Sequence, residues 1–266
     1  MRDRPIGVFD SGLGGLTVLH AMADLLPDED LLYLGDTARY PYGDKPIEQV
    51  ARFAEEIVDV LVGEGVKLVV VACNSATAAA LPQLRERVDV PVVGVVEPGL
   101  RAAAAASRTR HALVLGTEVT VQSGVYEHVA EERRLDLHVR TLACPGFVEL
   151  VESGRTEGPE TDRVVAARLA PQLTARTDTL VLGCTHFPLL ARPLSRAVGR
   201  NVTLVSSADE TAFEVRGLLE RTGWLAVRDR PGLRAFLTSG DPERFRALGL
   251  RFFGRPLVDV RHHPWR

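Results

Sequence analysis

Two cysteines occupy matching positions in the two halves of this chain. Cys73 lies in VVVACNSATAAA and Cys184 lies in LVLGCTHFPLLA. In both segments a strand-like apolar run ends in a small residue and Cys, and a polar pair then leads into an apolar, helix-compatible stretch. Ligands in α/β units bind where strands give way to helices, and the amides at a helix N-terminus favour a thiolate. The repetition therefore predicts two thiols that face one pocket and could act as a pair of acid and base groups.

A third cysteine, Cys144, follows a strand-like segment in ACPGF. The next residue is Pro145, which has no amide hydrogen to donate, so we interpret Cys144 as structural or pocket-lining. Three cysteines in a chain of 266 residues with no export signal argue against a disulfide framework. We therefore expect reduced thiols.

A histidine stands two residues beyond the second thiol. His is the side chain best suited to proton transfer near neutral pH, so His186 is a candidate partner of Cys184. The chain has no Cys-x-x-Cys or His-x-x-x-His spacing, and we expect no metal site. We expect His262 and His263 to be solvated.

A glycine-rich segment, FDSGLGGL, follows the first predicted strand. Gly12 and Gly14 match the first two glycines of a dinucleotide fingerprint, but Thr17 stands where the third belongs, so we expect no nucleotide cofactor. A turn of this kind lets backbone amides approach a small ligand. Asp10 and Ser11 then supply a carboxylate and a hydroxyl that can hold an ammonium and a carboxylate group. The alternative is that Asp10 caps a helix.

Strand-like and helix-like segments alternate along the first half. The pattern predicts strands at residues 5–9, 31–34, 67–72 and 91–95, with helices at 16–26, 47–62 and 76–87. Such alternation is typical of βαβ units in a largely parallel sheet. Residues 35–46 interrupt it with Gly, Pro and two Tyr, and we predict a binding loop there.

The alternation restarts after an Ala-rich helix at residues 100–107. We predict strands at 112–115, 135–143, 179–182 and 202–205, with helices at 119–130, 148–153, 162–173 and 190–198. A helix at 210–221, a strand at 233–238, a short helix after Asp241 and a strand at 257–260 follow. The predicted fold is α/β, with two pseudo-symmetric domains of mainly parallel sheets and an active site in the cleft between them. We expect residues 1–97 plus 207–266 to form the domain that carries Cys73, and residues 98–206 the one that carries Cys184.

The composition excludes several classes of function. Net charge is −3, which gives no general attraction to nucleic acid or to an anionic membrane. The longest apolar runs are strand-length, far short of the roughly 20 residues that span a bilayer. We identify no pattern of a signal peptide or membrane anchor, and we expect a cytoplasmic protein.

Several motifs together resemble the glutamate racemases. They are DSGLGGLTVL, DTARYPYGDK, ACNSATAAAL, PVVGVVEP and LGCTHFPLL, and the resemblance spans Ile6 to about Asp209. The resemblance implies a cofactor-independent isomerase that interconverts L- and D-glutamate and supplies D-glutamate for bacterial peptidoglycan, and so for cell wall biogenesis and cell shape. It also implies that Cys73 takes the α-proton of D-glutamate, and Cys184 that of L-glutamate. Each thiol would reprotonate the opposite face.

The resemblance further implies the residues that surround the substrate. Those that would bind it are Asp10, Ser11, Tyr42, Gly43, Asn74, Ser75, Thr185 and His186. Asp10 would also assist Cys73, while His186 and an acidic residue would assist Cys184. For that acid we choose Glu152 over Glu149. Ser75 stands where the family commonly has Thr, and because the hydroxyl is kept we expect binding to survive. We expect a homodimer.

Three alternatives remain open at this point. A related two-cysteine racemase could act on aspartate or a hydantoin. A Cys-His hydrolase could use Cys184 and His186 covalently, but it would leave Cys73 unexplained. A non-catalytic regulator could bind DNA gyrase, as some glutamate racemases do, but no basic patch or interaction motif supports that as the main role. The chain lacks the N-terminal extension of members activated by a peptidoglycan precursor, so we do not expect that regulation.

Overall fold

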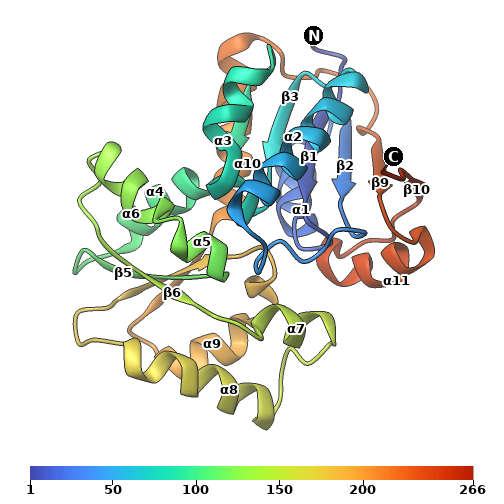
Figure 1. The fold of residues 1–266 in the computed structure, drawn as a ribbon. Coiled ribbons are helices and arrows are strands. Elements are labelled where there is room, and N and C mark those ends of the chain that lie inside the picture. The colour runs from blue at the N-terminus through green and yellow to red at the C-terminus, as the bar shows by residue number, and fades with distance from the viewer. Residues whose placement is uncertain (266) are drawn as a thin grey trace.

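Helices and strands alternate along the chain, and the strands form two separate parallel sheets (Figure 1). The computed structural model describes residues 1–265. The predicted α/β class with two parallel sheets is confirmed. Within the described residues, no helix has the length and apolar character needed to cross a membrane.

The first sheet has six strands, in the order β10-β9-β2-β1-β3-β4, and every neighbouring pair is parallel. Its strands are β1 (Ile6–Asp10), β2 (Leu31–Gly35), β3 (Leu68–Val71), β4 (Val92–Gly94), β9 (Arg234–Thr238) and β10 (Asp259–His262). The central strands β1, β2 and β3 are buried along their whole length, as expected of a parallel sheet covered on both faces.

Helices cover both faces of this sheet. They are α1 (Leu16–Leu25), α2 (Ile47–Gly63), α3 (Asn74–Arg87), α10 (Ser207–Thr222) and α11 (Pro242–Phe253). Val8 of β1 shares a core with Leu16 of α1, whereas the next residue, Phe9, shares a different core with Ile57 of α2. Successive strand residues therefore supply the two opposite cores.

The second sheet has four parallel strands, in the order β6-β5-β7-β8. Its strands are β5 (His111–Gly116), β6 (His138–Ala143), β7 (Thr179–Gly183) and β8 (Thr203–Ser206). The segments around it are α4 (Val96–Ala106), α5 (Glu118–Gln122), α6 (Val125–Glu132), α7 (Phe147–Glu152), α8 (Pro159–Leu169), α9 (Ala191–Val198) and the 3-10 turns η1 (Ala170–Gln172) and η2 (Phe187–Leu190). Leu113 packs toward α8 and α9, while Val114 packs toward α4 and α6.

Two predicted helices differ from the structure. The helix expected at 119–130 is split into α5 and α6 at Gly124, whose φ is +64°. That left-handed conformation suits glycine and ends a helix, which the apolar pattern alone did not indicate. The helix expected from residue 190 is preceded by η2, so Cys184 leads into a 3-10 turn and not directly into an α-helix.

The C-terminal segment returns to the first sheet, where β9 pairs with β2 and β10 pairs with β9. The first sheet thus draws on residues 6–94 and 234–262, and the second on residues 111–206. The domain bounds 1–97 plus 207–266 and 98–206 remain a prediction.

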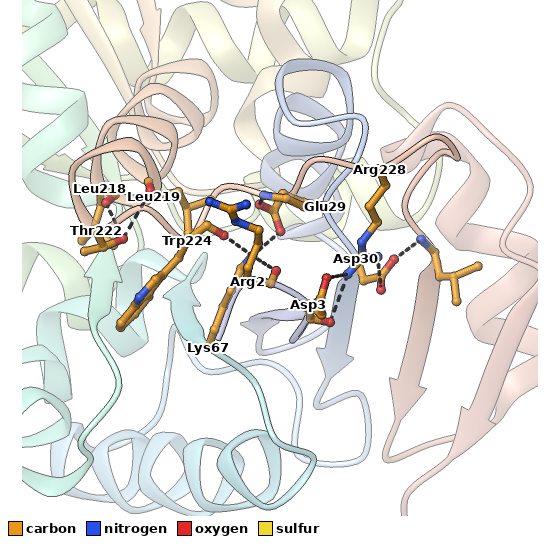
Figure 2. Close-up of polar contacts among 12 residues, drawn as sticks. Arg2, Asp3, Glu29, Asp30, Lys67, Leu218, Leu219, Thr222, Trp224 and Arg228 are labelled. Atoms are coloured by element: carbon orange, nitrogen blue, oxygen red, sulfur yellow. Dashed lines mark hydrogen bonds and ion pairs between the residues drawn. The ribbon is translucent and has the colours of Figure 1, made fainter.

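A buried ion pair joins the segment after α10 to the first sheet, at the end where β2 and β3 begin. Figure 2 shows Lys67 reaching Glu29, with Nζ 2.6 Å from Oε2, and the carbonyl oxygens of Arg2 and Trp224, each at 2.9 Å. Glu29 Oε1 also accepts a hydrogen bond from the amide of Ala226. Both charged side chains are almost fully buried, and a buried charge is tolerated only when it is paired and hydrogen-bonded.

Candidate active site

The two predicted thiols line one cavity of about 150 Å³. Cys73 follows β3 and α3 begins directly after it, while Cys184 follows β7. The cavity is lined at the carboxyl ends of strands from both sheets, where ligands bind in parallel α/β units. Of the other predicted site residues, those that line it are Ser11, Tyr42, Gly43, Asn74, Ser75, Thr185 and His186. Asp10 and Glu152 are absent from the lining, but each contacts a residue that lines it, Asp10 through Thr185 and Glu152 through His186.

Cys73 is the N-cap of α3, and its Sγ accepts a hydrogen bond of 3.4 Å from the amide of Ala76. Burial, and after it the negative charge of Asp10, raise the pKa of Cys73 to about 12, although amide hydrogen bonds from Ala76 and Ser11 lower it. The helix amide thus favours the thiolate, as expected, but burial and the charge of Asp10 outweigh it. The loss of water disfavours the charged sulfur more than the helix amides favour it.

Asp10 joins the two halves of the site. Its Oδ2 accepts a hydrogen bond of 3.0 Å from the amide of Gly12, and its Oδ1 accepts one of 3.3 Å from Thr185 Oγ1. Asp10 is fully buried, and burial raises its pKa. The N-cap residue of α1 is Gly15 and not Asp10, although hydrogen bonds from the amides of Gly12 and Gly15 lower the pKa of Asp10 against the effect of burial.

Cys184, His186 and Glu152 form a chain of polar contacts on the other side. His186 Nδ1 lies 3.9 Å from Cys184 Sγ, and Nε2 lies 3.2 Å from Glu152 Oε1. Burial lowers the pKa of His186, but the hydrogen bonds with Cys184 and Glu152 outweigh it and raise the pKa to about 10. These contacts therefore favour the cationic form of the imidazole. Glu149, the rejected alternative, lines the cavity itself.

The glycine-rich turn allows the two halves to approach closely. A Cβ on Gly14 would lie 2.2 Å from Thr185 Oγ1 and 2.6 Å from His186 Nδ1, so any side chain there would displace these two groups. The backbone of Gly14 lies so close to these two side chains that only glycine fits at this position.

Asn74 and Ser75, in the first turn of α3, also contact the other half. Asn74 Nδ2 donates a 2.8 Å hydrogen bond to the hydroxyl of Tyr126, while Ser75 Oγ lies 2.9 Å from Thr117 Oγ1. Asn74 Oδ1 has no hydrogen-bond partner within residues 1–265. Since buried polar atoms are normally paired, this oxygen can accept a hydrogen bond from a ligand.

Sequence reasoning missed several residues that line the cavity. Thr117 comes directly after β5, as Cys184 does after β7, and Cys73 is the second residue after β3. This shared strand-end position is the signal that could have found Thr117. Tyr40 lies in the predicted loop, and its ring centroid is 6.1 Å from that of His186. The side-chain hydroxyl of Tyr42 donates to buried Asp36. Cys144 lines the cavity.

The cavity contains polar side chains but no strong cation. Among the described residues that line it there is no Lys or Arg, and His186 is the basic side chain. Carboxylate groups of a ligand would therefore meet hydroxyl, amide and imidazole donors. In the part of the chain that the structure describes, no group of His, Cys, Asp and Glu is arranged to hold a metal ion.

Comparisons with known proteins match nearly the whole chain. Residues 6–215 match the model of the Asp/Glu/hydantoin racemase family. A curated glutamate racemase from Beutenbergia cavernae is 50% identical over 273 residues, which cover 98% of this chain and 93% of that protein. A crystal structure of a glutamate racemase from Bacillus anthracis superposes with a TM-score of 0.93 at 38% identity, over 99% of this chain and 98% of that one. A glutamate racemase from Francisella tularensis, solved in complex with D-glutamate, gives a TM-score of 0.92 at 28% identity over the same fractions.

Proposed function

Because this chain belongs to the Asp/Glu/hydantoin racemase family, we propose that it interconverts L- and D-glutamate by proton transfer at the α-carbon. It is an amino-acid racemase, and therefore an isomerase. The observation that supports the proposed chemistry best is that Cys73 and Cys184, from different sheets, line the same cavity. Inversion at carbon requires a base on one face of the substrate and an acid on the other.

In the proposed reaction from L- to D-glutamate, Cys184 acts as the base. A cationic His186 next to its sulfur stabilises the negative charge of a thiolate, and Glu152 holds the imidazole in its cationic form. The thiolate removes the α-proton and becomes a thiol. Cys73, whose raised pKa favours the protonated thiol, donates its proton to the opposite face and becomes a thiolate.

In the reverse reaction Cys73 removes the α-proton, which requires its deprotonated form. Its raised pKa is caused by burial and by the negative charge of Asp10. The ammonium group of a bound amino acid beside Asp10 would offset that negative charge. Substrate binding would thus favour the thiolate on Cys73, and Asp10 would assist this side through the substrate.

The polar residues of the cavity would hold the substrate and stabilise its transition state. An α-proton beside a carboxylate is weakly acidic, so preorganised donors must stabilise the charge that develops when it leaves. We assign this role to Asn74, Ser75 and Thr185 at one end of the substrate. Ser11 and the residues Tyr42 and Gly43 would bind at the other end.

The biological role follows from the proposed reaction. D-glutamate formed by this enzyme would supply peptidoglycan synthesis, which places the proposed activity in the cytoplasm, where cell wall precursors are made. We propose a homodimer as the working form and glutamate as the ligand, with no direct role for membrane or nucleic acid. Binding to DNA gyrase has no supporting feature in the sequence.

The test is racemisation of L- and D-glutamate by the purified protein in deuterated water without added cofactor. We expect optical rotation to decay and α-deuterium to enter the product. Cys73→Ala and Cys184→Ala should each abolish racemisation. Cys144→Ala is the matched control, because this thiol lines the same cavity but has no proposed role, and it should keep most of the activity.

The same assay with aspartate and with a hydantoin separates the related racemases. If the wild-type protein racemises one of these compounds and leaves glutamate unchanged, the substrate assignment is wrong. If the Cys73→Ala protein retains full activity, the two-thiol mechanism is wrong, and a reaction that needs only Cys184 and His186 becomes the better explanation.

A further inference from the structure

The buried carboxylate of Asp36 accepts hydrogen bonds from four donors. The side chain is fully buried, and it accepts hydrogen bonds from the hydroxyl of Tyr42, from Arg39 Nε at 2.6 Å and from Ser239 Oγ at 2.7 Å. The fourth donor is Trp265 Nε1, at 2.6 Å. Two of these donors belong to the loop at residues 36–46, while Ser239 and Trp265 come more than 200 positions later in the sequence.

Arg39 makes a second connection between the loop and Trp265. Its guanidinium carbon lies 3.8 Å from the ring centroid of Trp265 on one side and 4.0 Å from that of Phe53 on the other. Cations are attracted to the faces of aromatic rings, most strongly to Trp. Arg39 also pairs with Asp36 and Glu56, so the guanidinium is held between two rings and two carboxylates.

The chain after β10 is fixed in place to make these contacts. The amide of His263 donates a 2.8 Å hydrogen bond to the carbonyl of Thr238 at the end of β9. Thr37 in the loop in turn contacts Thr238 through its hydroxyl at 2.7 Å. Trp265 is therefore positioned by the carboxyl edge of the first sheet, next to the loop and outside the cavity.

The loop carries part of the cavity wall. Five consecutive residues that line the cavity come from it, namely Tyr40, Pro41, Tyr42, Gly43 and Asp44. No strand or helix spans residues 36–46. Backbone hydrogen bonds join this segment to its surroundings at its ends, from Asp36 to Asp10 and from Val119 to Gly43, and the side-chain contacts add to them. A loop that must be ordered on binding lowers affinity, whereas one that is already ordered does not.

We propose that Trp265 is a positioning residue for the substrate-binding loop, which it holds in the binding conformation through Asp36 and Arg39. The proposal rests on the proposed function for its effect on glutamate. Trp265 itself does not line the cavity, so its contribution reaches the substrate through the loop. Loss of Trp265 should therefore weaken substrate binding and leave the reaction at the two thiols largely intact.

The experiment compares wild type with Trp265→Ala and Trp265→Phe. We expect Trp265→Ala to raise KM for both enantiomers about tenfold, which corresponds to roughly 1.4 kcal/mol, while kcat stays within about twofold of wild type. Trp265→Phe keeps a ring over Arg39 but loses the N–H donor to Asp36. Its KM should therefore lie between that of wild type and that of Trp265→Ala. If the substitutions only destabilised the fold, they would lower the amount of active enzyme and hence the apparent kcat, without this graded change in KM.

Trp224→Phe is the matched control, because the chain has two tryptophans and Trp224 lies at the other end of the sheet, beside Lys67 (Figure 2). It should leave KM unchanged. Hydrogen–deuterium exchange of the peptide that covers residues 36–46 provides a readout that does not need activity. Exchange there should be faster in Trp265→Ala than in wild type, while β5 should exchange equally in both.

The outcomes separate the two proposals. A wild-type protein that is inert on glutamate contradicts the proposed function, and the exchange measurement still decides whether Trp265 orders the loop. Unchanged exchange at residues 36–46, or an unchanged KM in an active Trp265→Ala protein, would overturn the role of Trp265. A lower kcat at constant KM would overturn it as well.

Discussion

His186 stands between Cys184 and Glu152, and its Nε2 lies 3.2 Å from Glu152 Oε1. Within residues 1–265 no histidine contacts the other thiol in this way, and Cys73 instead has a helix amide at 3.4 Å and the negative charge of Asp10 nearby. The two thiols therefore share a cavity but differ in what stabilises their charged forms. Four predictions follow from this difference and from the contacts that hold the halves together.

Glu152→Gln should impair the Cys184 side first. Glu152 helps to raise the pKa of His186 to about 10, so its loss lowers that pKa and the imidazole loses its proton at a lower pH. We expect kcat/KM for L-glutamate to fall roughly 10- to 100-fold and its alkaline limb to move toward neutral pH. The measurement is a pH profile in each direction. Glu149→Gln is the control, and an equal shift in both variants would contradict the assignment of Glu152.

Asp10→Asn should make Cys73 more reactive as a nucleophile. Asp10 is the second cause of its raised pKa, after burial, so removal of that negative charge lowers the pKa and increases the thiolate fraction. In a Cys144→Ala, Cys184→Ala background, we expect iodoacetamide to alkylate Cys73 roughly tenfold faster at mildly alkaline pH. Racemisation in the otherwise wild-type protein should fall, because the proposed attraction between the substrate ammonium and the charge of Asp10 is lost. An unchanged alkylation rate would show that Asp10 does not act on this thiol.

Gly14→Ala should abolish activity in a protein that still folds. The new Cβ would lie 2.2 Å from Thr185 Oγ1 and 2.6 Å from His186 Nδ1, so these groups must leave their positions in the cavity wall. We expect kcat/KM to fall at least about 100-fold, because small displacements of catalytic groups have effects of this size. Gly63→Ala is the control, because a Cβ there meets no atom within 4 Å. Retention of wild-type activity by Gly14→Ala would contradict the observed packing.

Lys67→Met should destabilise the fold without a direct effect on the site. The change leaves Glu29 buried without its partner, which costs about 3–5 kcal/mol in the free energy of unfolding measured with urea. Glu29→Gln added to Lys67→Met should recover part of that loss. The exposed pair of Arg216 and Glu220 gives the control, because Arg216→Ala should change stability by less than about 1 kcal/mol. An equally small effect of Lys67→Met would mean that the buried pair contributes no more than a surface one.

The regular alternation of strands and helices made the fold class predictable. Apolar runs such as Leu68–Val71 indicated buried parallel strands, and both sheets contain them. Local backbone breaks were not predictable in the same way, because Gly124 adopts a left-handed conformation within a pattern that otherwise continues as helix. The order of strands in a sheet, such as the pairing of β9 with β2, depends on contacts between segments that are far apart in the sequence. Local patterns do not show it.

The identities of the site residues were easier to predict than their charge states. The strand-end positions of Cys73 and Cys184 indicated a shared pocket, and they line the same cavity. The helix amide at Cys73 suggested a thiolate, but the degree of burial decides the pKa, and burial is a property of the folded chain. Contacts such as Trp265 with Asp36 join positions more than 200 residues apart, so no local motif marks them.

The central claim is that each thiol serves one enantiomer, and stereospecific exchange of the α-proton tests it most directly. L- and D-glutamate are incubated separately with Cys73→Ala and with Cys184→Ala in deuterated water, and α-deuterium is measured by mass spectrometry. The account predicts that any exchange by Cys73→Ala is confined to L-glutamate and any by Cys184→Ala to D-glutamate, with no racemisation in either. Exchange of both enantiomers by one of these single variants, or the opposite pairing of thiol and enantiomer, would contradict it.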